Sequence, residues 1–219
     1  MIKNIIFDFD GVLVDSEILV AKAFAKYMKN FDIEIDEKEF ATFAGKKTVQ
    51  VIDILSKKYS IRDQQKFFND IMEIASNIYK NELTTVEGAY EFVSNIKLNL
   101  YIGSNSMQDR ILQGLQRVEL SKYFKPDHVY SFDLVGKPKP EPDIYLKAIK
   151  DNDLNKNQTI IIEDSVVGVK AGVSAGVKVI GLTAGGHWHD NRDEKELIDA
   201  GAFAVTNDYK DILQIIKRN

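Results

Sequence analysis

The stretch IIFDFDGVLVDSE (residues 5–17) places a run of apolar residues directly before two acids. The run is short, β-branched and aromatic, which predicts a strand over residues 2–7 that is buried on both faces. Asp8 and Asp10 follow where this strand ends, and side chains at i and i+2 share one face of a strand. Gly11 then permits the chain to bend. An acidic pair at this position suggests a functional site rather than an ordinary turn.

Beyond residue 85, strand-like and helix-like segments alternate. We predict strands over 98–105, 128–132, 159–165, 178–186 and 202–207, and helices over 106–118, 142–153, 166–176, 193–201 and 209–218. Ser106 is the predicted N-cap of the first of these helices. Strands that alternate with helices at this spacing predict βαβ units and a parallel sheet. The predicted fold class is α/β, with a doubly wound parallel sheet.

One long segment breaks this alternation. Residues 15–84 contain no convincing strand, and their apolar residues recur at helical spacing, as in Val51, Ile54 and Leu55. We therefore expect a core domain formed by residues 1–14 and 85–219, interrupted by a helical insert at residues 15–84.

Composition limits the functions that this chain can have. Its 219 residues carry a formal net charge of −4 without a basic block, so the sequence predicts neither a nucleic-acid partner nor a membrane partner. The absence of cysteine excludes disulfides, thiolate zinc sites and cysteine nucleophiles. No window approaches the roughly 18 apolar residues of a membrane span, and the N-terminus does not resemble a signal peptide. We expect a cytoplasmic monomer.

The polar residues that could form a site follow the predicted strands. In an open parallel sheet, ligands bind beyond the carboxyl ends of the strands. The groups at these ends are Asp8-Phe9-Asp10, Gly103-Ser104-Asn105 and Glu163-Asp164-Ser165, with the segment GKPKPEPD before the strand that ends in Glu163. Clustered carboxylates need a cation, and oxygen ligands without sulfur favour a hard ion such as Mg²⁺.

Carboxylates, a hydroxyl, exposed backbone amides and a lysine at one edge suit phosphoryl transfer. Catalysis of this reaction depends on positioning and on neutralising the transferring group. One carboxylate can be the nucleophile and form an aspartyl-phosphate, and a second can act as acid and base.

Four ordered motifs give the chain a resemblance to a known family. DFDGVLVDSE (8–17) resembles the first motif of the haloacid dehalogenase superfamily, DxDGxxxDS or DxDGxxxDT. Ser104 in IGSNS is similar to the second motif, KPEPD to the third, and Glu163-Asp164 in IIEDS to the fourth. The helical insert after the first motif resembles the cap domain of the branch that contains β-phosphoglucomutase and small-sugar phosphatases, with a Rossmann-like core.

The resemblance implies a role for each acidic residue. Asp8 would attack phosphorus. Asp10 would protonate the leaving oxygen and later activate water, and its backbone carbonyl would contact the metal. Asp164 would bind Mg²⁺ together with Asp8, supported by Glu163.

The resemblance also implies a phosphate-binding set. Ser104 and the backbone amide of Asn105 would hold phosphate oxygens beside the lysine of the third motif. Two lysines precede prolines there, and the family form Lys-Pro-x-Pro-Asp fits Lys139, which lies 25 residues before Asp164. Lys137 is the alternative.

Three functions remain open under this resemblance. Asp10 disfavours a dehalogenase, because dehalogenases of the superfamily lack an acid there. β-Phosphoglucomutases carry a histidine and an arginine where this chain has Val20 and Thr48. This difference favours a phosphatase. Its substrate would be a small phosphorylated metabolite, either a sugar phosphate or a sugar-acid phosphate. A mutase of the β-phosphoglucomutase type is one alternative, and a catalytically silent relative that binds a phosphorylated metabolite is the other.

Two further clusters lie outside these motifs. Gly45, Lys46 and Lys47 in FAGKKT are expected to face the active site, where the lysines would meet an anionic substrate; the alternative is a solvated lysine pair. His187 and His189 in GGHWHD form a poor transition-metal site without a third ligand, so we interpret them as part of a loop at the edge of the cleft.

Overall fold

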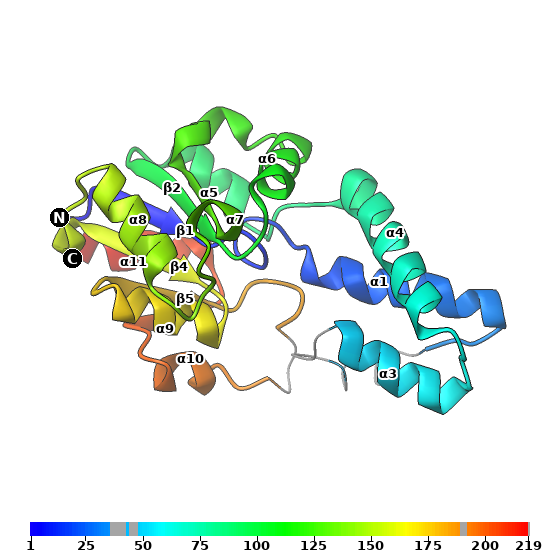
Figure 1. Cartoon of the computed structure of the whole chain (residues 1–219). Coiled ribbons are helices and arrows are strands. Elements are labelled where there is room, and N and C mark those ends of the chain that lie inside the picture. Colours follow the sequence, from blue (N-terminus) through cyan, green and yellow to red (C-terminus); the bar gives the residue numbers. More distant parts are fainter. Residues whose placement is uncertain (36–42, 44–47, 189–191, 219) are drawn as a thin grey trace. The chain divides into compact units, whose positions relative to one another are not determined.

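The computed structural model describes residues 1–35, 43, 48–188 and 192–218. The chain divides into two compact units (Figure 1). The core unit comprises Met1–Asp15 and Thr84–Asn219, and the helical unit comprises Ser16–Leu83. The predicted segment Gly45–Lys47 and His189 lie outside the described residues.

Six parallel strands form one sheet in the described part of the core unit. Their order is β3-β2-β1-β4-β5-β6, which confirms the predicted α/β class and doubly wound parallel sheet. The strands are β1 (Asn4–Phe7), β2 (Asn99–Ser104), β3 (Val129–Ser131), β4 (Thr159–Glu163), β5 (Lys178–Leu182) and β6 (Ala204–Thr206). The first strand lies between β2 and β4, so the acids that follow it emerge near the middle of the sheet.

Helices connect these strands as expected for βαβ units. They are α5 (Ala89–Asn95), α6 (Gln108–Arg117), α7 (Phe132–Val135), α8 (Asp143–Asp151), α9 (Val166–Ser174), α10 (Lys195–Asp199) and α11 (Tyr209–Arg218). Short 3-10 helices occur at η2 (Ser121–Tyr123), η3 (Pro126–His128) and η4 (Lys156–Gln158). No described helix has the length and apolar character that a bilayer crossing requires.

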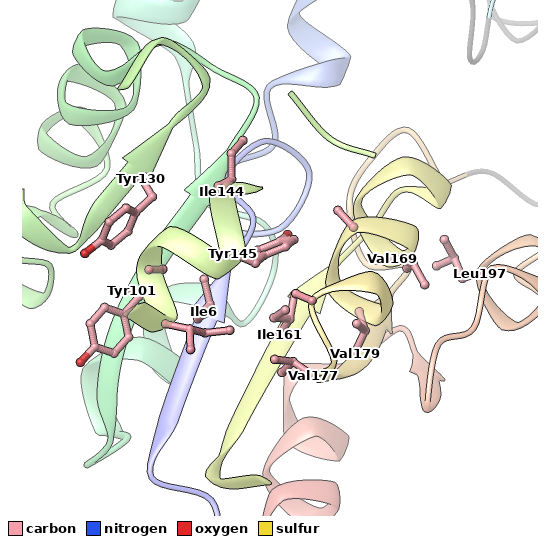
Figure 2. Close-up of a cluster of buried hydrophobic side chains, with 14 residues drawn as sticks. Ile6, Tyr101, Tyr130, Ile144, Tyr145, Ile161, Val169, Val177, Val179 and Leu197 are labelled. Atoms are coloured by element: carbon pink, nitrogen blue, oxygen red, sulfur yellow. The ribbon is translucent and has the colours of Figure 1, made fainter. Parts of the chain in front are cut away.

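Both faces of β1 are buried, as its sequence predicts. On one face, the ring of Phe7 meets Phe92 of α5 and Phe124 edge-on, with centroids 6.1 and 5.9 Å apart. On the other face, Ile6 belongs to a cluster that includes Tyr145 of α8 and Val169 of α9 (Figure 2). Because its side chains are held from both sides, β1 is a rigid support for the residues that follow it.

The described part of the helical unit is built from α1 (Glu17–Met28), η1 (Lys29–Phe31), α3 (Thr48–Tyr59) and α4 (Gln64–Glu82). Aromatic rings dominate its interior. Tyr27 and Phe67 stack with centroids 4.5 Å apart, and Phe24 meets Phe67 edge-on at 6.0 Å. Val51 and Leu55 are buried, as apolar residues at helical spacing predict, whereas Ile54 is exposed.

One local prediction in the core unit is wrong. Ser106 does not cap α6, since that helix begins at Gln108 and Met107 occupies the N-cap position with extended backbone. The Ser106 hydroxyl instead donates a hydrogen bond to Asp10 Oδ2. Ser106 stands one residue too early to cap this helix, and Asp133 accepts a hydrogen bond from the backbone N–H of Gln108 at 3.0 Å in its place.

Candidate active site

The ends of β1 and β4 bring three acids together. Phe7 pairs with Ile162 in the sheet, and the backbone N–H of Asp8 donates to the Ile162 carbonyl at 2.9 Å. This register places Asp8 beside the Glu163-Asp164 pair. One oxygen from each of the three carboxylates lies within 4.8 Å of the others, and all three residues are buried. The strand ends therefore gather the acids that the motifs predicted at one edge.

Lys139 links two of these acids. Its Nζ lies 2.5 Å from Asp8 Oδ1 and 2.5 Å from Glu163 Oε1, and its side chain is only 3% exposed. By contrast, Lys137 pairs with Asp143 at 3.1 Å and its side chain is 65% exposed. The geometry therefore favours Lys139 over Lys137 as the lysine of the site.

Glu163 has no capacity left to bind a ligand directly. Its Oε1 accepts from Lys139 and from the Tyr145 hydroxyl at 2.8 Å. Its Oε2 accepts from the backbone N–H of Asp164 and from both the N–H and the hydroxyl of Ser165. These donors fill the roughly four lone-pair positions of a carboxylate. Glu163 thus holds Lys139 in place, and Asp8 and Asp164 are the acids that can turn oxygens toward a cation.

The cluster holds more acidic than basic side chains. Burial raises the pKa of Asp8 well above its ordinary value; the nearby Glu163 and Asp164 raise it further, while Lys139 lowers it. Burial by itself lowers the pKa of Lys139, but its ion pairs with Asp8 and Glu163 outweigh that effect and leave the pKa raised. Three buried carboxylates thus face one ammonium. A hard cation fits this oxygen-only set, because it would offset the negative excess and favour the ionised form of Asp8.

The end of β2 supplies the predicted phosphate-binding residues. Ser104 is buried, and its hydroxyl accepts from the backbone N–H of Ser106 at 3.0 Å. The Asn105 side chain bonds the backbone of Lys139 twice: its Oδ1 accepts from the N–H at 2.8 Å, and its Nδ2 donates to the carbonyl at 3.3 Å. Asn105 therefore ties the second motif to the third, a role that its loop-like sequence does not reveal.

Asp10 has different surroundings from Asp8. Its Oδ2 accepts from the Ser106 hydroxyl at 2.5 Å, and its Oδ1 accepts from an Nη of Arg110 at 3.1 Å. The Asp10 carboxylate does not belong to the metal-binding group of Asp8, Glu163 and Asp164. The predicted contact between its backbone carbonyl and a metal remains a prediction.

A loop after β5 reaches the same site. Nε2 of His187 lies 3.1 Å from Asp164 Oδ2, and the backbone N–H of Gly186 donates to Asp15 Oδ1 at 3.0 Å. Gly11 makes room for this arrangement: its φ is +78°, and a Cβ there would lie 1.9 Å from Asp164 Oδ2. His187 therefore contacts a predicted metal ligand, which is a more specific position than the predicted loop at the edge of the cleft.

Several of these contacts leave no signal in the sequence. Ser106 and Arg110 lie about 100 residues from Asp10, and neither belongs to a motif that points to it. His187 stood out only as part of a histidine cluster. Tyr145 lies two residues after KPEPD, but this position in the sequence does not predict its bond to Glu163.

Comparison with known proteins agrees with this geometry. Residues 5–182 match the family described as haloacid dehalogenase-like hydrolase. The chain is 30% identical over 220 residues to a phosphorylated carbohydrates phosphatase of Thermotoga maritima, covering 98% of each chain. It is also 29% identical over 188 residues to the 6-phosphogluconate phosphatase of Escherichia coli K12, covering 85% of each.

A solved structure extends the similarity to the whole fold. A HAD family hydrolase from Deinococcus radiodurans, solved with bound phosphate and sodium, is 27% identical to this chain. It superimposes with a TM-score of 0.86 over 99% of this chain and 96% of that one. The similarity therefore covers both units and not only the motifs.

Proposed function

This chain belongs to the haloacid dehalogenase-like hydrolases and is a phosphoric monoester hydrolase of that family, and from that premise we propose that it is a Mg²⁺-dependent phosphatase of small phosphorylated metabolites. The substrate class is a sugar phosphate or a sugar-acid phosphate. The names of the two relatives described above support this choice, since both act on phosphorylated carbohydrates or their acids.

The observation that carries the proposal is the buried group of Asp8, Lys139, Glu163 and Asp164. A nucleophilic carboxylate must approach a phosphoryl group that is itself negatively charged, and only nearby positive charge makes this approach favourable. Lys139 lies 2.5 Å from Asp8 and is also paired with Glu163 at 2.5 Å. Such preorganised charge costs no rearrangement when the reaction occurs.

The first half of the reaction forms an aspartyl-phosphate. An oxygen of Asp8 attacks phosphorus in line with the ester oxygen, so a bond from Asp8 to phosphorus forms as the bond from phosphorus to the ester oxygen breaks. Asp10 donates its proton to the departing oxygen, which leaves as an alcohol. The hydroxyl of Ser104, the backbone amide of Asn105 and the Lys139 ammonium hold the phosphoryl oxygens.

The second half releases phosphate. Asp10, now ionised, takes a proton from a water molecule whose oxygen attacks phosphorus. The bond from Asp8 to phosphorus breaks, and inorganic phosphate leaves, with Asp8 ionised and Asp10 protonated again. Asp8 and Asp164 would hold Mg²⁺, which would neutralise charge on the transferring group.

Hydrolysis is favoured over a mutase reaction by the residues of the helical unit. The position where the related mutases carry a histidine is Val20, which packs against the apolar interior of the helical unit. Thr48 stands at the position of the mutase arginine, at the start of α3. Neither residue offers the charge that would retain a sugar phosphate for a second transfer.

A panel of phosphorylated metabolites, scored by kcat/KM with Mg²⁺ and with EDTA, tests the proposal. We expect phosphate release that requires Mg²⁺ and falls at least about 10⁴-fold in Asp8→Asn, because the nucleophile is lost. Asp151→Asn is the matched control, since Asp151 pairs with Lys147 on the surface of α8. Release that persists in Asp8→Asn contradicts the aspartyl-phosphate route, and no release across the panel favours the silent relative.

Isotopic water separates the phosphatase from the mutase. In water enriched in ¹⁸O, a phosphatase places one labelled oxygen in each molecule of released phosphate. A mutase returns the phosphoryl group to sugar, so an isomeric sugar phosphate without label would favour that alternative.

A further inference from the structure

The Asp10 carboxylate accepts a hydrogen bond from a serine to which the proposed function assigns no role. The Ser106 hydroxyl donates to Asp10 Oδ2 at 2.5 Å, and Arg110 donates to Oδ1 at 3.1 Å. A carboxylate that accepts one hydrogen bond on each oxygen keeps lone pairs for further partners. The contact with Ser106 can therefore persist while Asp10 exchanges a proton with the leaving oxygen or with water.

Ser106 lies in a short loop between β2 and α6 that is bonded on both sides. Before it, Ser104 is buried at the end of β2, and the Ser104 hydroxyl accepts from the backbone N–H of Ser106 at 3.0 Å. The side chain of Asn105 bonds the backbone of the third motif twice. After it, the backbone N–H of Gln108 donates to Asp133 Oδ1 at 3.0 Å. A hydroxyl presented by a loop that is held in this way can set the orientation of the group that it bonds.

Ser106 is better suited than Arg110 to this task. A serine hydroxyl has a single side-chain torsion between it and the backbone, whereas a guanidinium ends a long side chain with many rotamers, and that of Arg110 is 42% exposed. A hydroxyl also both donates and accepts, so it can stay bonded to Asp10 in the acid form and in the carboxylate form. A guanidinium only donates.

We propose that Ser106 is a positioning residue for the general acid, because its hydroxyl holds the Asp10 carboxyl in the orientation from which it protonates the leaving oxygen. This inference rests on the proposed phosphatase function. The proton passes from Asp10 to the ester oxygen as the bond from phosphorus to that oxygen breaks, and Ser106 gives up no proton of its own. Ser106 thus connects two groups of the first half-reaction: its backbone bonds the Ser104 hydroxyl, and its side chain bonds Asp10.

A residue that acts through the general acid should matter only where the leaving group needs a proton. The 4-nitrophenolate ion is stable and can leave without one, whereas the alkoxide of benzyl alcohol is strongly basic and must be protonated as it leaves. Ser106 should therefore be needed for benzyl phosphate and dispensable for 4-nitrophenyl phosphate. The two esters have similar sizes, so a general disturbance of the loop would affect both.

Single-turnover reactions with enzyme in excess compare the two esters. The measured quantity is the release of benzyl alcohol or nitrophenol, which reports the first half of the reaction alone. Ser106→Ala keeps the backbone N–H that bonds Ser104, and in this variant we expect the rate constant for benzyl phosphate to fall about tenfold and that for 4-nitrophenyl phosphate to fall less than about twofold. Ser106→Thr should restore the rate with benzyl phosphate, because it keeps a hydroxyl.

Ser94→Ala is the matched control, and both of its rate constants should equal those of the wild type. The Ser94 hydroxyl donates to the Glu91 carbonyl within α5, so its removal takes a serine hydroxyl from the same unit without touching Asp10.

A double-mutant cycle tests whether Ser106 acts through Asp10. In Asp10→Asn no acid remains to be positioned, so adding Ser106→Ala should leave the ratio of the two rate constants unchanged. The inference would be overturned by an equal fall for both esters in Ser106→Ala, by no fall for either, by a fall that Ser106→Thr does not reverse, or by a further fall of the ratio in the Asp10→Asn background.

The same measurements separate this inference from the proposed function. If the wild type releases neither alcohol nor nitrophenol, the phosphatase proposal fails and the role of Ser106 fails with it. If the wild type releases both but the ratio in Ser106→Ala equals that of the wild type, the role of Ser106 alone is overturned.

Discussion

The two units of this chain differ in whether they bury an ion pair. In the core unit, besides exposed pairs, Lys139 and Glu163 form an ion pair whose side chains are 3% and 0% exposed. In the described part of the helical unit, the ion pairs lie on the surface, as that between Lys66 and Asp70 does at 2.6 Å, where the lysine side chain is 66% exposed. The distances are similar, but the surroundings of the two pairs differ completely.

This difference shows that buried ion pairs occur at the candidate active site, whereas the helical unit depends on apolar packing for its stability. A buried pair loses its hydration, so it persists only when all its partners are in place, and removal of one partner leaves an uncompensated charge. An exposed pair is screened by water and contributes about 0–1 kcal/mol. The helical unit is stabilised instead by aromatic rings such as Tyr27 and Phe67, which stack 4.5 Å apart. In the core unit, the buried charges belong to the candidate active site, where the proposed reaction requires them.

Substitution of Lys139 should have the largest effect. We expect Lys139→Met to lower kcat/KM roughly 1,000-fold or more, since it removes positive charge from the transferring group. It should also lower the free energy of unfolding by about 3–5 kcal/mol in EDTA, because Asp8 and Glu163 lose their shared partner. Kinetics and urea denaturation measure the two effects.

Lys66→Met in the helical unit is the matched control for this substitution. Removal of the Lys66 charge should change the free energy of unfolding by about 0–1 kcal/mol. If both variants lost the same free energy of unfolding, burial of the ion pair would have no effect on its contribution to stability in this chain.

The second effect concerns packing in the helical unit. Phe67→Ala removes a fully buried ring that contacts both Tyr27 and Phe24, and we expect a loss of about 3–5 kcal/mol. Met72→Ala on the same helix is the control, because Met72 is exposed and should lose little. Hydrogen exchange shows which of the two units loses stability. Faster exchange in the helical unit with an unchanged β1 is expected, and uniform acceleration in both units would show that the two unfold together.

The smallest effect concerns the histidine that contacts Asp164. We expect His187→Gln to weaken Mg²⁺ binding by about tenfold, because contacts that orient a metal ligand typically contribute that much. Trp188 is the only tryptophan in the chain, and its ring centroid lies 5.8 Å from that of His187, so its fluorescence can follow the titration without turnover.

His128→Gln is the control for the His187 substitution. The His128 Nδ1 bonds the Leu100 carbonyl, and its ring stacks on Tyr101, so His128 belongs to neither the acid cluster nor its contacts. Equal Mg²⁺ affinity in the wild type and in His187→Gln would show that His187 does not contribute to metal binding.

Much of the core unit was predictable because its signals are local. A run such as that of β1 requires burial on both faces, and parallel strands place their carboxyl ends at one edge, so Asp8 and Asp164 could be grouped from the order of elements alone. Capping was less predictable. Ser106 has the side chain of an N-cap, but α6 begins at Gln108, where Asp133 from another segment accepts from the first backbone N–H.

The choice between the two lysines of the third motif agrees with the resemblance. The family form fits Lys139 better than Lys137, and in the structure Lys139 is buried against Asp8 while Lys137 meets Asp143 with its side chain 65% exposed.

The amino-acid sequence by itself determined the α/β class, the helical character of the inserted segment and the residue types that meet beyond the strands, because periodicity and strand order are properties of neighbouring residues. Only the tertiary structure decided which side chains hold those residues: Glu163 on Lys139, Arg110 on Asp10 and His187 on Asp164. These contacts join residues from 23 to 100 positions apart. Their geometry depends on how strands and loops pack in three dimensions, which no local pattern encodes.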